Sequence, residues 1–257
     1  RMAGRGLARL QEEGIDTAHG LLEAQAAALN RGYMRRLTQG LPLIRCKQAL
    51  SLDGRTAMAS GESKWITGEA ARRDVQRLRA RSCAVLTGIG TVLEDDPRLD
   101  VRDVTLPGQR QPLRVVLDRE LRMPADARML SIPGRTLIFS HDADNSDKHG
   151  VLKGAGAEVI ILEERDFLRG VLKYLAGKEQ VNEVLVEAGA TLTGALLQDG
   201  LVDELILYQA PVILGDSARG LFHLPHLQNM KDRVKLTLTE CRHIGGDIRL
   251  QFAVGKQ

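Results

Sequence analysis

Short apolar segments alternate with helical stretches from Leu43 onward. The apolar segments read LIRCKQAL, CAVLTG, LRVVLD, TLIFS, EVIIL, EVLVEAG and ELILY. Many are rich in Val and Ile, and some are nearly continuous, which is typical of strands buried on both faces. Residues 70–79 are good helix formers and follow Thr67, an N-cap candidate, so they predict a helix. Further helices are predicted over residues 166–175 and 191–198. The alternation predicts an α/β fold with a mostly parallel sheet flanked by helices.

The two ends of the chain follow other patterns. Between residues 234 and 254, apolar and polar residues alternate around Gly245-Gly246, which predicts a C-terminal antiparallel hairpin. Residues 1–40 carry apolar residues at helical spacing, and Pro42 ends that pattern. Residues 1–40 are too short and too polar for a domain, so we interpret them as a linker or the remnant of a missing domain, ahead of one domain over 41–257.

Composition and charge narrow the class of protein. The chain is 43% hydrophobic and 27% charged, which is typical of a globular protein. Its aromatic residues are one Trp, three Tyr and four Phe, and its net charge is only +3. Few rings and weak charge argue against a nucleic-acid binder. Three distant cysteines predict neither disulfides nor a zinc site and favour a cytoplasmic setting. No apolar run is long enough to span a membrane, and the histidines form no metal motif.

Three segments could carry chemistry: KQALSLDGRTAMASGESKWIT (47–67), TGIGTVLEDDPRLDVR (87–102) and VLVEAGATLTGALLQDG (184–200). In each, a predicted strand ends in a turn of glycines or small residues before a helix. Ligands of α/β sheets bind at such strand ends, and glycine turns bring backbone N–H groups close to phosphates. Each segment taken alone is equally compatible with an ordinary strand-to-helix connection or a solvated helix end.

Taken together, the three segments resemble a known family. With RRDVQRLRARS and VDELILYQAPVILG, they follow the order found in the reductase domain of the bifunctional riboflavin-biosynthesis deaminase/reductase, across residues 43 to about 254. Residues 1–40 resemble the end of the deaminase half, whose zinc motifs this sequence lacks. The resemblance implies a dihydrofolate-reductase-like fold, a homodimer, and NADPH as hydride donor. The implied reaction converts 5-amino-6-(5-phosphoribosylamino)uracil to the ribitylamino product.

The resemblance also assigns residues to ligands. It places NADP contacts at Ala49, Trp65, Thr91, Asp95 and Arg119, and along the turn of Gly189, Ala190, Thr191, Leu192, Thr193, Gly194 and Ala195. A cation at Arg119 could meet a 2′-phosphate. Substrate contacts are expected at Ser63, Arg79, Leu99, Arg102 and Glu187. Arg79 and Arg102 can hold a phosphate through their guanidinium forks.

Reduction of the substrate needs more than a hydride. The ribose ring must first open to an imine or carbonyl, which requires a proton donor and a group that stabilises the electrophile. Lys47 and Asp95 are the catalytic candidates, although Lys47 could equally form a structural ion pair at the end of the sheet.

Two other functions stay open. One is another NADPH reductase of the same fold acting on a pterin or related pyrimidine, and the other is a non-catalytic dimerisation module. The pair Arg79 and Arg102 favours a phosphorylated substrate over an uncharged pterin.

Overall fold

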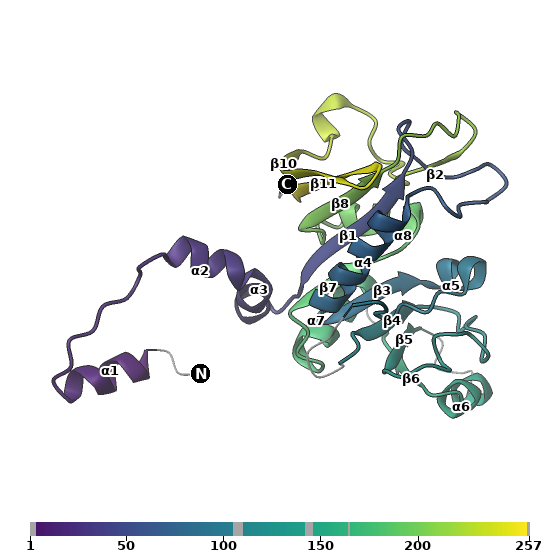
Figure 1. Cartoon of the computed structure of the whole chain (residues 1–257). Helices are drawn as coiled ribbons and strands as arrows, with labels where there is room; N and C mark the ends of the chain where they lie inside the picture. The colour runs from purple at the N-terminus through teal and green to yellow at the C-terminus, as the bar shows by residue number, and fades with distance from the viewer. Residues whose placement is uncertain (1–3, 105–109, 142–145, 164, 256–257) are drawn as a thin grey trace.

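A large twisted sheet forms the centre of the computed structural model, which describes residues 4–104, 110–141, 146–163 and 165–255 (Figure 1). Two of the strands form a small separate sheet. The strands are β1 (Leu43–Leu50), β2 (Arg55–Ala57), β3 (Ala84–Gly88), β4 (Leu113–Leu117), β5 (Thr136–Ser140), β6 (Ala157–Ile161), β7 (Glu183–Val186), β8 (Glu204–Gln209), β9 (Arg219–Gly220), β10 (Leu236–Ile244) and β11 (Asp247–Val254).

The order of strands explains where a ligand can bind. Within the described residues, the large sheet has nine strands in the order β10-β11-β8-β1-β7-β3-β4-β5-β6, and β2 pairs with β9. All contacts from β8 through β6 are parallel, whereas β11 pairs with β8 and with β10 in antiparallel fashion. The predicted parallel sheet and terminal hairpin are therefore confirmed. From β1 the chain passes over the position of β7 to β3 and then adds β4, β5 and β6 outward on that side. It returns to β7 and then crosses β1 to β8 on the other side, so the winding direction reverses at the centre of the sheet.

Helices cover both faces of the sheet. Ala71, Val75 and Leu78 of α4 pack on Leu185 of β7 and on β8, and a neighbouring cluster joins α5 and α6 to the same face. The opposite face is covered by α7 and α8. The helices are α1 (Arg5–Glu12), α2 (Glu23–Leu29), α3 (Arg31–Gln39), α4 (Glu69–Arg81), α5 (Ile89–Asp95), α6 (Ser146–Gly154), α7 (Phe167–Gly177) and α8 (Ala190–Gln198).

The N-terminal helices differ in how they contact the sheet. Neither α1 nor α2 buries a residue, and both extend away from the sheet (Figure 1). In contrast, α3 is fixed at the amino ends of the strands by ion pairs of Arg31 with Glu204 and of Arg35 with Asp203. The helices predicted within residues 1–40 are thus present, and only the last one packs on the sheet.

The start of α4 is one residue later than the sequence predicts. Gly68, not Thr67, is the N-cap residue, and the helix start has no hydrogen bond from an N-cap side chain. The Gly68 N–H instead donates to the Asp247 carboxylate, which comes from the far end of the chain. Local sequence favours Thr as the N-cap residue, but here the N-cap residue is a glycine whose N–H is bound by a distant carboxylate.

Candidate functional site

An open cleft of about 1710 Å³ lies at the carboxyl ends of the central strands. Its walls are the end of β1, the segment 56–67, α4, the turn from β3 to α5, and the turn after β7. In open α/β sheets, ligands bind at this edge where the winding direction reverses. Drug-sized ligands occupy pockets of roughly 300–1,000 Å³, so this cleft has room for a dinucleotide and a second molecule.

A cluster of three charged side chains forms the floor of the cleft. Arg79 of α4 donates from Nε and Nη2 to the two carboxylate oxygens of Glu187, at 2.6 and 3.1 Å. Lys47 of β1 places its Nζ 3.9 Å from Glu187 Oε2. Side chains alternate between the two faces of a strand, so Lys47 and Ala49 lie on the face that α4 covers. Gln48 lies on the other face and donates to the Ala188 carbonyl. Strand alternation therefore aims Lys47 into the cleft.

Burial and charge set the protonation of this cluster. Burial lowers the pKa of Lys47, and the nearby Glu187 carboxylate only partly offsets this effect. Burial acts to raise the pKa of Glu187, but attraction to Arg79, their hydrogen bonds and Lys47 outweigh it and hold that pKa below its usual value. Glu187 is thus an anion, and Lys47 is an acid that releases its proton more easily than an ordinary lysine.

The two arginines expected at a substrate phosphate have different surroundings. The Arg79 guanidinium is bound by Glu187 and by the Asp100 carbonyl at 2.9 Å, and its side chain is 11% exposed. Arg102 is 43% exposed and pairs with Asp100 at 3.0 Å. Arg102 therefore keeps donors directed to the cleft, whereas Arg79 braces Glu187.

A second charged group lies on the opposite wall. Asp95 at the end of α5 pairs with Lys64 at 3.0 Å, so that this ion pair joins the helix to the segment 56–67. Trp65 follows Lys64, is 71% exposed, and lies 4.6 Å below the Arg72 guanidinium. Ser63 lines the same wall. Ser63 and Trp65 of the first predicted segment and Asp95 of the second thus share one cleft with Lys47.

Two glycine turns open onto the cleft. Gly88 and Gly189 are the N-cap residues of α5 and α8, and neither helix start is capped by a side chain. A Cβ at Gly189 would meet nothing within 4 Å, so a ligand can approach the backbone N–H groups at this turn. Thr91 of α5 and Ala190 of α8 line the cleft beside these turns.

Most of the residues assigned by resemblance line this cleft, but two do not. Thr193 is fully buried and its hydroxyl accepts from Gln48 Nε2 at 2.7 Å. A Cβ at Gly194 would lie 2.1 Å from the His223 carbonyl oxygen, so Gly194 permits close packing of a loop. Both lie on the side of α8 that faces the protein, because a helix turns successive residues to different faces. The residues on the cleft are Lys47, Ala49, Ser63, Trp65, Arg79, Thr91, Asp95, Leu99, Arg102, Arg119, Glu187, Gly189, Ala190, Thr191, Leu192 and Ala195.

Sequence reasoning missed several residues of the cleft. Arg122 and Arg128 join Arg119 on the wall behind β4, and Arg72 stacks on Trp65. Arg119 also lies 5.0 Å above the Phe167 ring. The spacing of Arg72 seven residues before Arg79, on one helix face, was the signal that could have found Arg72. Arg128 carries no local signal, since folding alone brings it here.

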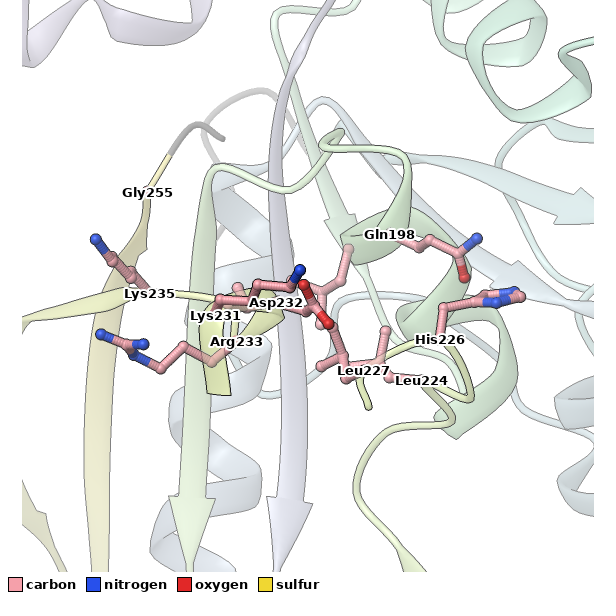
Figure 2. Close-up of a pocket in the computed structure, with 11 residues that line it drawn as sticks. Gln198, Leu224, His226, Leu227, Lys231, Asp232, Arg233, Lys235 and Gly255 are labelled. Atoms are coloured by element: carbon pink, nitrogen blue, oxygen red, sulfur yellow. The ribbon is translucent and has the colours of Figure 1, made fainter. Parts of the chain in front are cut away.

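A second cavity of about 550 Å³ lies beside the C-terminal end of α8. Figure 2 shows Arg233 and Lys235 extending to one side, away from Leu224 and Leu227, while His226 points to the other side near Gln198. The cleft, where charged groups converge, is the candidate active site.

Across the described ranges, no three His, Cys, Asp or Glu side chains gather closely enough to hold a metal ion. None of the helices in the described part of the chain combines the length and apolar character that crossing a bilayer requires.

Comparison with known proteins agrees with this geometry. The family model described as the RibD C-terminal domain matches residues 42–250. The riboflavin biosynthesis protein RibD of Escherichia coli K12 is 46% identical over 98% of this chain and 71% of its own length, and that of Haemophilus influenzae is 43% identical over 98% and 69%. The structure of Acinetobacter baumannii RibD, form 1, superposes with a TM-score of 0.88 at 41% identity, covering 98% of this chain and 69% of its own.

Fold, cleft and relatives define an α/β oxidoreductase of riboflavin biosynthesis, a class that uses a nicotinamide cofactor. Within that class, the chain belongs to the RibD family, in the part described as the RibD C-terminal domain. The resemblance predicted from the sequence is confirmed.

Proposed function

We propose that this chain catalyses the NADPH-dependent reduction of 5-amino-6-(5-phosphoribosylamino)uracil to 5-amino-6-(5-phosphoribitylamino)uracil. The observation that carries the proposal is the Lys47–Glu187–Arg79 cluster, which lies on the floor of a cleft between two glycine turns. An acid with a lowered pKa beside open volume suits proton transfer to a bound substrate.

The cofactor side of the cleft fits a dinucleotide. The turn Gly189, Ala190 and Thr191 would hold the pyrophosphate, since it lines the cleft at a helix start and a Cβ at Gly189 would meet nothing within 4 Å. Trp65, Thr91 and Asp95 would contact the rest of the cofactor, together with Ala49, Leu192 and Ala195. Bound NADPH would supply the hydride. We expect Thr193 and Gly194 to support this turn from the protein side, Thr193 through its hydrogen bond with Gln48 and Gly194 through close packing, rather than by contacting the cofactor.

Specificity for the phosphorylated cofactor would come from the wall behind β4. Arg119 is exposed there beside Arg122 and Arg128, and all three line the cleft. Arginine forks bind phosphate bidentately, so this wall suits a 2′-phosphate. The proposal of NADPH over NADH rests on these cations.

The substrate side contains the groups that recognise a phosphoribosyl pyrimidine. Arg102 would hold the phosphate with its exposed donors, and Ser63 would add a hydroxyl. Glu187 would accept from the pyrimidine or from ribityl hydroxyls, and Arg79 fixes the orientation of that carboxylate. Leu99, which is buried, would provide a backbone contact at its left-handed conformation of φ 51°.

The catalytic roles follow from position and protonation. Lys47 would hold a proton at Nζ and transfer it as the ribosyl group opens, because burial makes this lysine a stronger acid. Asp95 would orient the bound ligands from the opposite wall, where Lys64 holds it.

Assembly and domain context complete the proposal. The relatives are longer than this chain, which covers 71% and 69% of two of them. We propose that residues 1–40 are a linker and remnant of a zinc deaminase domain, followed by the reductase domain over 41–257. We also propose a homodimer that forms through the outer strand β10, where Leu236 and Leu238 are 41% and 54% exposed. Three free cysteines favour a cytoplasmic setting.

An assay of NADPH oxidation with the phosphoribosylamino-pyrimidine tests the proposed reaction. We expect turnover with this substrate, none with dihydrofolate, and a loss of about 100-fold or more in kcat for Asp95→Ala and for Lys47→Ala. Lys231→Ala, at the second cavity, serves as control and should match the unmodified protein. Full NADPH oxidation by either cleft variant would refute its catalytic role. Calorimetry that shows no NADPH binding would favour a non-catalytic dimerisation module.

A further inference from the structure

The turn between β10 and β11 contacts the start of α4. Asp247, the first residue of β11, accepts a hydrogen bond from the Gly68 backbone N–H at 2.8 Å. Its side chain is buried, in a residue that is 3% exposed. A carboxylate at the N-terminus of a 13-residue helix is favoured by the helix dipole. The Asp247 carboxylate therefore joins the hairpin turn to the start of the helix.

Gly245, at the turn of the hairpin, also lies close to α4. Gly245 has φ 64°, and a Cβ there would lie 2.8 Å from the Ala70 Cβ. Only glycine fits both the left-handed conformation and the short distance. The hairpin turn thus rests directly on the first turn of α4.

The start of α4 in turn holds the cleft wall. Arg72 donates from Nη1 to the Thr67 carbonyl at 2.8 Å, and its guanidinium stacks 4.6 Å above the Trp65 ring. Trp65 and Thr67 both line the cleft. A displacement of the helix start therefore moves Arg72 and, with it, the exposed indole.

A second contact between the same two elements lies deeper. Asp74 of α4 accepts from Arg249 of β11 at 3.2 Å and from the Tyr208 hydroxyl at 2.6 Å. All three side chains are buried. Because Asp74 fixes the middle of the helix, the contact of Asp247 controls only its first turn.

We propose that Asp247 is a positioning residue of the active site, which sets the cleft wall Ser63–Thr67 through Gly68 and Arg72. The effect on cofactor binding rests on the proposed function, in which Trp65 contacts NADPH. The effect on the wall itself does not depend on it.

The single Trp of the chain provides a direct test. Acrylamide quenching of Trp65 fluorescence in the ligand-free protein measures how accessible the indole on the cleft wall is. Comparing the change in KM for NADPH with the change in kcat shows whether cofactor binding is affected. Asp247→Ala leaves the Gly68 N–H unpaired, so we expect stronger quenching and a rise in KM of about fivefold, the size of a lost helix cap, with kcat within about twofold. Asp247→Asn retains an acceptor oxygen and should restore both values.

Asp232→Ala is the matched control. Asp232 also accepts from a backbone N–H, that of Asn229 at 3.2 Å, but it lies at the second cavity (Figure 2). It should lower thermal stability without changing quenching or KM. If Asp247→Ala behaves like this control, the inference is wrong.

If Asp247→Ala does not fold, Gly245→Ala forces the same helix start away from the hairpin, and unchanged quenching in that variant would overturn the inference. If the unmodified protein fails to oxidise NADPH, the proposed function fails, and the quenching comparison alone then decides the role of Asp247.

Discussion

Arginine–carboxylate pairs stand at both ends of the central strands, and the two ends can be compared directly. At the amino ends, Arg45 of β1 donates to Glu183 at 2.5 Å and to Glu204 at 2.6 Å. At the carboxyl ends, Arg79 pairs with Glu187 at 2.6 Å. In both places the carboxylates are largely removed from water, with exposed fractions between 5% and 22%.

The surroundings of the two pairs differ. At the amino ends, α3 covers the charges so closely that a Cβ at Gly32 would lie 2.5 Å from Glu183 Cγ. At the carboxyl ends, the pair borders a cleft of about 1710 Å³. A buried ion pair thus indicates a functional site only where its charges face open volume. The amino-end pairs attach a helix, and the carboxyl-end pair can act on a ligand.

Removing one carboxylate from each end should give the largest contrast. Glu187→Gln leaves Arg79 without its anionic partner, and Glu204→Gln leaves Arg31 without one and Arg45 with Glu183 alone, so both should lower the free energy of unfolding by about 2–4 kcal/mol. Only Glu187→Gln should also lower kcat/KM, by about 100-fold or more, because it removes a group that faces the substrate. Denaturant unfolding and steady-state kinetics measure the two effects separately. A comparable loss of kcat/KM in Glu204→Gln would abolish the distinction between the ends.

The pH dependence of turnover should show an intermediate effect. Lys47 donates its proton only while it is charged, so kcat should fall as the pH rises through a pKa that lies below the ordinary 10.5 of lysine. Glu187→Gln removes the carboxylate that raises the Lys47 pKa, and this alkaline limb should move to lower pH. Glu204→Gln, at the other end of the strands, should leave the limb in place. A limb that stays unmoved in Glu187→Gln would show that another group is the donor.

The smallest effect is expected at the rim of the cleft. Arg119→Ser removes one of the cations behind β4, so KM for NADPH should rise by about five- to tenfold while KM for NADH stays unchanged. Arg119 is exposed, and the unfolding free energy should change little. Arg233→Ser, at the second cavity, is the control and should alter neither KM. Equal changes in KM for NADPH and for NADH would mean that Arg119 does not recognise the 2′-phosphate.

Hydrophobic patterning was sufficient for most of the fold. The runs LRVVLD and TLIFS predict strands, and β4 and β5 occupy them. Alternation around Gly245-Gly246 predicts the hairpin of β10 and β11. These elements follow from the local period of apolar residues, which changes between strand and helix. The short strands β2 and β9 show no such period, because each is only two or three residues long and is a strand only by pairing with the other.

The site was predicted in part. Strand ends and glycine turns identified the segments of Lys47, Thr91 and Gly189, because parallel strands end at one edge of a sheet. The pairing of Arg79 with Glu187 could not be predicted, since it joins two elements that are distant in sequence. The orientation of Thr193 and Gly194 away from the cleft also depends on how α8 packs.

The kinds of elements, their order and the family can thus be predicted from the amino-acid sequence, since they depend on local pattern and on motifs that keep their spacing. Which charges meet, and which of them face open space, depends on how the chain packs. Thr67 has the local features of a cap, yet Asp247 holds the start of α4. Contacts across about 180 residues depend on chain packing, and no local pattern of residues encodes such contacts.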